Sequence, residues 1–196
     1  MGWCMHKCYL PISQLAKDSP CVKTGIIPLA MDTDLEVLVG KLLRQSGLRL
    51  SVAESCTGGL IGHRITNVPG SSTYYMGSVT AYAYEAKVRI LRVKWRTLET
   101  YGAVSEETVL EMAKGVRRAL AADIGLSISG IAGPGGGTPE KPVGLTWIGV
   151  SSYSVNRAWQ YVWEGDRLSV KEQSAEQALR CLVEFLQDHP ENNSKS

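Results

Sequence analysis

The chain has 196 residues, of which 44% are hydrophobic and 20% charged, and its formal net charge is +2. This length suits one well-packed domain and is too short for two large ones. The near-neutral charge gives no sign of a nucleic-acid surface, and no apolar run approaches the roughly 18–20 residues that span a bilayer. The first residues also lack the pattern of a secretory signal. We therefore expect a cytoplasmic protein with neither a membrane nor a nucleic-acid partner.

The cysteines do not suggest a disulfide framework or a metal site. There are five of them, an odd number in a chain without a secretory signal. Cys4, His6 and Cys8 lie close together, but no second ligand pair has zinc-site spacing and Cys21 alone does not complete a tetrahedral set. We expect no bound metal.

Periodic sequence begins after Met31, and helical and strand patterns then alternate. Residues 1–30 are predicted to be a poorly ordered extension, 31–188 a single domain and 189–196 a polar tail. An alternating pattern of this kind is typical of a layered α/β sheet. The expected elements are a helix from 35 that ends at Gly47, a strand at 49–53, helices at 60–66, 85–91 and 105–121, strands at 79–84, 124–131, 145–150 and 157–163, and a helix at 168–187.

The first polar, glycine-rich segment is 53–59, with the sequence AESCTGG. A strand that runs into Gly58-Gly59 at a helix start would expose backbone N–H groups and place Ser55 and Thr57 beside them. This geometry suits an anion or an oxyanion. A helix N-cap with close backbone packing explains the same residues equally well.

A serine and a lysine make the second candidate. Ser72 lies in a Pro-Gly-Ser-Ser turn, fifteen residues before Lys87. A serine becomes a nucleophile when a base removes its proton, and a lysine can be that base when burial lowers its pKa. From these residues alone, a surface turn and a surface lysine are the commoner explanation.

The third candidate is the glycine-rich stretch 127–144, which follows an expected buried strand. It has neither the Walker A order nor the dinucleotide fingerprint, but so many glycines favour a backbone that approaches a ligand. His63 is the single histidine outside the two tails. A hydrolase built on this chain would therefore use serine–lysine or cysteine chemistry.

Seven ordered strings together resemble the C-terminal domain of the CinA (competence/damage-inducible) family across roughly 33–185. They are AESCTGG at 53–59, TNVPGSS at 66–72, EAK at 85–87, GAVSE at 102–106, SGIAGP at 129–134, KPVG at 141–144 and GDR at 165–167. The resemblance implies an α/β/α layered domain with a mixed central sheet. It also implies hydrolysis of the carboxamide of nicotinamide mononucleotide, which gives nicotinic acid mononucleotide and ammonia without a metal or cofactor, as part of pyridine-nucleotide recycling. The N-terminal domain of long CinA proteins is missing, so the chain looks like the stand-alone amidase type. We also expect a homodimer or a higher homo-oligomer.

Carried over by position, the resemblance makes Ser72 the nucleophile and Lys87 its general base, with Ser55 and Tyr82 orienting groups or relaying protons. The fifteen-residue separation of Ser72 and Lys87 matches the family's spacing. The implied substrate-binding residues are Thr57, Gly58, Gly59, Ser129, Gly130, Gly133, Gly135, Gly136, Lys141 and Arg167.

Two alternatives stay open. Cys56 could be the nucleophile, with Glu54 or Lys87 as base, because a thiolate is the stronger nucleophile. The chain also departs from the family, which usually has Ser-Asn where this chain has Ala83-Tyr84. That change leaves room for an altered substrate or for a non-catalytic nucleotide-binding or regulatory module.

Overall fold

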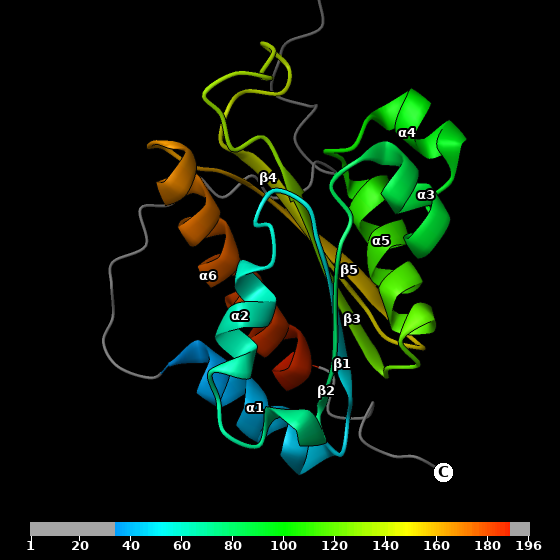
Figure 1. The fold of residues 1–196 in the computed structure, drawn as a ribbon, viewed down its shortest axis with the longest axis vertical. Helices are drawn as coiled ribbons and strands as arrows, with labels where there is room; N and C mark the ends of the chain where they lie inside the picture. Colours follow the sequence, from blue (N-terminus) through cyan, green and yellow to red (C-terminus); the bar gives the residue numbers. More distant parts are fainter. Residues whose placement is uncertain (1–33, 189–196) are drawn as a thin grey trace, which may run out of the picture.

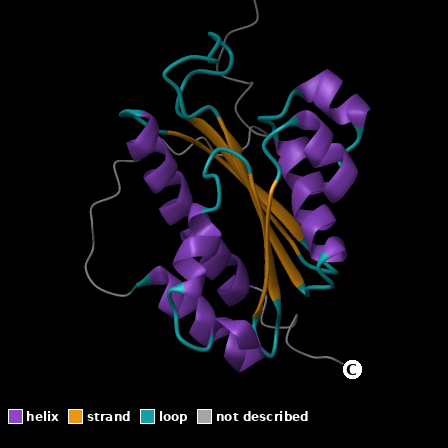
Figure 2. Ribbon diagram, in the orientation of Figure 1, coloured by secondary structure: helices purple, strands orange, loops and turns teal. Residues whose placement is uncertain are grey.

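A mixed five-stranded sheet with the order β2-β1-β3-β4-β5 separates two layers of helices (Figures 1 and 2). The computed structural model describes residues 34–188, so the predicted extension and tail lie outside the described residues. The three neighbouring strands β2, β1 and β3 are parallel, whereas β4 runs antiparallel to both of its neighbours. The strands are β1 Leu50–Glu54, β2 Tyr75–Thr80, β3 Ile124–Gly130, β4 Leu145–Ser151 and β5 Asn156–Val162.

The helices divide evenly between the two faces of the sheet. In Figure 1, α1, α2 and α6 cover one face, and α3, α4 and α5 cover the other. Among residues 34–188, no helix has both the length and the apolar character needed to cross a membrane. The helices are α1 Leu35–Ser46, α2 Leu60–Thr66, α3 Tyr84–Leu91, α4 Trp95–Tyr101, α5 Glu106–Ala119 and α6 Arg167–Asp188, and a short 3₁₀ turn occupies Ser71–Thr73.

The central strands are buried on both faces, because helices cover each side of the sheet. Every residue of β1 is buried, and Val52 points into the larger of the cores, together with residues of α1, α2 and α6. Ala53 points the opposite way, into a smaller core with Met112 and Val116 of α5. The sheet therefore carries an apolar cluster on each side, as a three-layer domain requires.

Strands β2 and β3 lie on opposite sides of β1 in the sheet, and the connections that lead to them run over opposite faces. The connection from β1 to β2 passes through α2 on one face, and the connection from β2 to β3 passes through α3, α4 and α5 on the other (Figure 1). The carboxyl ends of β1, β2 and β3 consequently open at one edge of the sheet, where ligands bind in folds of this kind. β5 ends at the same edge because it is antiparallel to β4.

The structure confirms most of the expected elements and corrects one strand. Helix α1 ends at Gly47 in the left-handed conformation (φ 64°), and Ser105 caps α5 by accepting a hydrogen bond from the N–H of Thr108 (3.3 Å). The strand expected at 79–84 is wrong, since β2 ends at Thr80. Alternating β-forming residues continue into the following loop, and Gly77 lies inside the true strand, so the pattern misled the prediction. The seven-residue helix α4 was not predicted.

Candidate active site

Lys87 is a buried amine at the carboxyl edge of the sheet. It is the fourth residue of α3 and only 1% exposed. Side chains on a helix lean toward its N-terminus, so Lys87 reaches back over the first turn. Its Nζ donates to the carbonyl oxygens of Ala81 (2.7 Å) and Tyr82 (3.0 Å) and to Ser55 Oγ (3.0 Å).

This environment shifts the equilibrium of the amine toward its neutral form. Burial lowers the pKa of Lys87 to about 8, because the charged form loses its hydration, and the nearby Cys56 opposes the shift only in part. A neutral amine has two N–H groups and one lone pair. With the carbonyls of Ala81 and Tyr82 accepting the two N–H groups, the lone pair faces Ser55 Oγ, where it can accept the hydroxyl proton.

Ser55 is positioned by the turn that follows β1. Its N–H donates to the carbonyl of Ile128 on β3 (3.1 Å), and its own carbonyl accepts from the N–H of Gly58 (3.2 Å). The side chain is 8% exposed. A serine fixed in this way beside a low-pKa amine is a candidate nucleophile with its base.

The turn itself is held by Glu54, whose carboxylate is fully buried. It accepts hydrogen bonds from the hydroxyl of Thr57 (2.7 Å) and from the N–H groups of Gly59 (3.0 Å), Ile61 (3.1 Å) and Gly62 (2.9 Å). The carboxylate thereby satisfies the N–H groups at the start of α2. Those groups are not available to a substrate anion, so the substrate-binding role predicted for Thr57 and Gly59 is wrong. Their neighbour Gly58 is exposed and does not line the cavity described next.

A cavity of about 190 Å³ opens over Ser55 and Lys87. Ser129 and Gly130 at the end of β3 form one wall. Tyr82 and Arg167 lie at its rim, and the guanidinium of Arg167 donates to Tyr82 Oη (3.0 Å) and to the carbonyl of Gly133 (2.7 Å). The cavity therefore combines a buried candidate nucleophile and base with an exposed cation.

Ser72 does not belong to this site. It lies exposed in the 3₁₀ turn before β2, whereas Lys87 follows the other end of that strand. A strand of six residues extends by roughly 16–20 Å, which puts the two side chains at opposite edges of the sheet. The predicted pairing of Ser72 with Lys87 is wrong, and Ser55 takes the position beside the amine.

The glycine-rich loop 131–144 reaches the cavity through Ala132. Lys141 anchors it, because Nζ donates to the carbonyls of Tyr101 and Val104 (2.8 Å), so this amine holds the loop and does not line the cavity. Gly133 contributes its carbonyl to Arg167. Gly135 and Gly136 are exposed along the loop and do not line the cavity, contrary to the prediction.

Cys56 also lines the cavity, but its thiol is a poor candidate nucleophile. The side chain is 5% exposed, and burial raises its pKa to about 12. A reactive cysteine needs its thiolate populated near neutral pH. Glu54 is fully engaged at the start of α2, so the carboxylate considered as its base serves another purpose.

The departure at Ala83-Tyr84 has a structural explanation. Ala83 precedes α3 in an extended conformation, and Tyr84 Oη accepts a hydrogen bond from the N–H of Ala103 (3.3 Å). Ala103 and Val104 line the cavity, and sequence analysis did not single them out. The signal that could have identified them is the GAVSE string at 102–106, which contains both residues. Tyr84 thus ties the start of the lysine-bearing helix to a wall of the cavity.

The described residues contain no cluster of side chains suited to a metal ion. Within 34–188 no three His, Cys, Asp or Glu side chains gather closely enough to hold an ion. The cysteines and histidine considered near the N-terminus lie outside the described residues.

The chain is similar to known proteins over almost all of its described residues. The family model for the CinA C-terminal domain matches residues 32–186. CinA-like proteins from Kosmotoga olearia and Salinibacter ruber are each 49% identical over 148 residues, which is 76% of this chain and 36% of theirs. The chain thus spans about a third of the length of these curated relatives.

Solved structures give the same result. A CinA superfamily protein from Klebsiella pneumoniae has a TM-score of 0.77 at 33% identity, covering 81% of this chain and 99% of its own. The competence/damage-inducible protein CihA from Agrobacterium tumefaciens has a TM-score of 0.72 at 34% identity, covering 80% and 98%. The chain therefore belongs to the CinA C-terminal domain family.

Proposed function

We propose that this domain hydrolyses the carboxamide of nicotinamide mononucleotide, with Ser55 as nucleophile and Lys87 as general base. The observation that carries the proposal is the 3.0 Å contact between Ser55 Oγ and a buried amine whose pKa is lowered to about 8. Together they form the activated nucleophile that acyl transfer needs.

The steps follow from the positions of the groups. Neutral Lys87 accepts the proton of Ser55, and Oγ attacks the amide carbon to give a tetrahedral intermediate. The protonated amine then gives that proton to the leaving nitrogen, and ammonia departs from an acyl-serine. Water, deprotonated by the same amine, attacks the ester carbonyl, and the amine returns that proton to Ser55 Oγ as the ester bond breaks. This step releases nicotinic acid mononucleotide and restores Ser55.

The mouth of the cavity supports a phosphorylated substrate. Arg167 is oriented by Tyr82 Oη and the carbonyl of Gly133, and a guanidinium of this kind binds phosphate in a bidentate manner. With the ring and carboxamide on Ser55, the phosphate would lie toward Arg167. Ser129 also lines the cavity, which supports a contact between its side chain and the amide.

A test is ammonia release by the purified protein from nicotinamide mononucleotide, nicotinamide riboside and nicotinamide. We expect the mononucleotide to be the best substrate and the Ser55→Ala variant to release no ammonia. Binding of the mononucleotide by calorimetry, with no ammonia over hours, would instead show a non-catalytic nucleotide-binding module.

A further inference from the structure

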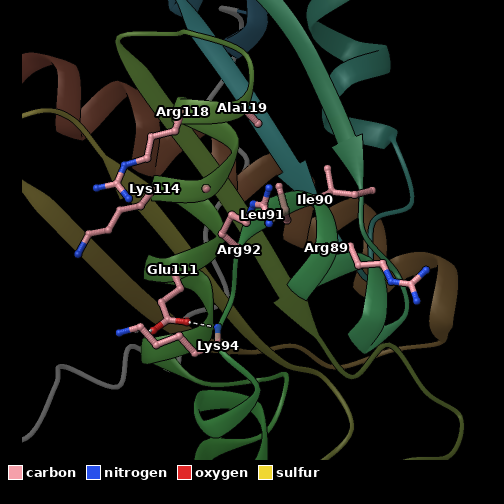
Figure 3. A pocket seen from close by; sticks show the side chains of 10 residues that line it. Arg89, Ile90, Leu91, Arg92, Lys94, Glu111, Lys114, Arg118 and Ala119 are labelled. Carbon is pink, nitrogen blue, oxygen red and sulfur yellow. Dashed lines mark hydrogen bonds and ion pairs between the residues drawn. The ribbon is translucent and has the colours of Figure 1, made fainter.

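A second cavity, of about 460 Å³, lies away from the catalytic groups, between the end of α3 and the outer side of α5 (Figure 3). Its volume falls within the ~300–1,000 Å³ usual for small-molecule sites. It shares no lining residue with the cavity over Ser55 and Lys87. The lining residues are Arg89, Ile90, Leu91, Arg92, Lys94, Glu111, Lys114, Gly115, Arg118 and Ala119.

The charge of this lining is concentrated. It holds five cations and one carboxylate, a balance of +4, whereas the entire chain carries only +2. The carboxylate, Glu111, is already engaged, because it accepts from the N–H of Lys94 (2.8 Å) and from Thr97 Oγ1 (3.0 Å). Only Lys94 among the cations of the lining reaches it, at 3.8 Å.

The remaining four cations have no carboxylate partner among the described residues. Within 34–188, no ion pair involves Arg89, Arg92, Lys114 or Arg118. Lys114 and Arg118 are four residues apart on α5, a spacing at which like charges repel. Figure 3 shows them pointing to the same side as Lys94.

Helix dipoles account for only some of these charges. Arg89 and Arg118 lie in the last turns of their helices, where cations are favourable. Arg92 is the C-cap of α3 and benefits in the same way, whereas Lys114 lies before the last turn of α5.

Arg92 adds a second kind of observation. It is the residue after α3 and has φ 58°, in the left-handed region that glycine ordinarily occupies at this position. An arginine here costs stability that a glycine would not, and in Figure 3 it lies at the centre of the cavity lining.

The base of the cavity is rigid. Gly115 of α5 packs so closely on α3 that a Cβ there would overlap the carbonyl of Leu91. Backbone hydrogen bonds also join Arg92 N–H to the carbonyl of Val88 (3.1 Å) and Val93 N–H to that of Lys87 (3.2 Å). The cations therefore project from fixed backbone positions, as a preformed binding site requires.

We propose that this cavity binds a small-molecule polyphosphate, an anion with two or more adjoining phosphate groups. Cations from two separate segments, the end of α3 and the outer side of α5, would contact different phosphates. A nucleic acid fits less well, because binding a phosphate backbone needs basic surface over many phosphates, and outside this cavity the chain carries a net negative charge. The exposed Ile90 and the stems of the arginines offer apolar contact beside the phosphates.

The test is calorimetric titration of the full chain with inorganic tripolyphosphate at physiological salt. We expect one equivalent to bind, and Arg92→Gly and Lys114→Gln each to weaken binding about tenfold, the loss of one charge-assisted contact. Arg92→Gly should also raise the midpoint of thermal unfolding by about 2–4 °C without ligand, so weaker binding cannot be attributed to misfolding.

Two variants control for other sites. Lys41→Gln removes an exposed cation on α1, on the opposite face of the sheet, and should leave binding unchanged. Arg167→Ala should also leave it unchanged, which separates this cavity from the proposed phosphate contact of the active site. Duplex DNA is titrated in the same way. The proposal is overturned if tripolyphosphate does not bind, whether or not the DNA does, or if Arg167→Ala alone abolishes tripolyphosphate binding.

Discussion

The amine of Lys87 lies 3.0 Å from the hydroxyl of Ser55, although 32 residues separate them in the chain. Ser72, the serine that the resemblance to the CinA family made the nucleophile, lies at the opposite edge of the sheet. We expect Ser55→Ala to lower kcat/KM for the mononucleotide by on the order of 10³-fold or more, since it removes the nucleophile. Ser72→Ala is the matched control and should stay within about twofold of the parent. The reverse pattern in an ammonia-release assay would disprove the assignment.

The pH dependence follows from the low pKa of Lys87. Only its neutral form can accept a proton, and with a pKa of about 8 roughly one molecule in ten is in that form at pH 7. The rate should therefore rise about tenfold per pH unit at low pH and level off above pH 8. Lys87→Arg should be inactive throughout, because a guanidinium does not deprotonate in this range. A flat profile between pH 6 and 8 would contradict the role of Lys87.

The buried amine should also make the fold less stable at neutral pH. The pKa of Lys87 is about 8 in the folded protein, against 10.5 for a lysine exposed to water, so folding is penalised below pH 8, where the folded and unfolded chains both carry the charge. That penalty, about 3 kcal/mol, is relieved as pH rises from 8 to 10.5. Denaturant unfolding should show the parent gaining stability across this window relative to Lys87→Met. Parallel stability curves for the two proteins would contradict it.

Cys56 should be dispensable for the chemistry. Its thiol is buried, with a pKa raised to about 12. We expect Cys56→Ala to retain turnover within about threefold while losing roughly 1 kcal/mol of stability through the vacated volume. Peptide mass spectrometry after alkylation of the native protein should find Cys56 unmodified. Rapid labelling at Cys56 with loss of activity would revive the thiol mechanism.

Arg167 should act on substrate binding. The Arg167→Ala variant loses a charge-assisted contact with the phosphate. We therefore expect its KM for the mononucleotide to rise about 10–100-fold, with a smaller change in kcat. Nicotinamide riboside lacks the phosphate, so its hydrolysis serves as an internal control and should change little. An equal loss for both substrates would place Arg167 in the chemical step.

Much of the architecture could be predicted from local sequence. The bounds of α2, the Gly47 and Ser105 caps and the buried strands β3 and β4 follow from periodicity and capping residues alone. These features depend on neighbours in the chain, so sequence pattern is sufficient to find them.

The pairing at the site could not be predicted in the same way. Spacing cannot show that a six-residue strand carries Ser72 away from Lys87, or that the turn after β1 points Ser55 toward α3. Nor does the sequence reveal that the carboxylate of Glu54 accepts hydrogen bonds from the N–H groups at the start of α2, so that these groups cannot bind a substrate anion. These relationships arise from the order of strands in the sheet. The homodimer and the cytoplasmic location stay predictions.

The hydrogen bond between Arg167 and Tyr82 joins segments that follow the two outermost strands, β5 and β2. The mouth of the site therefore exists only when all five strands are in register. A chain that lacks either edge strand cannot form this contact, so it should bind the mononucleotide weakly and turn it over slowly at low substrate concentration. Heat inactivation and loss of tertiary structure should then follow a single curve, so that enzyme activity becomes a direct measure of how much of the protein is folded.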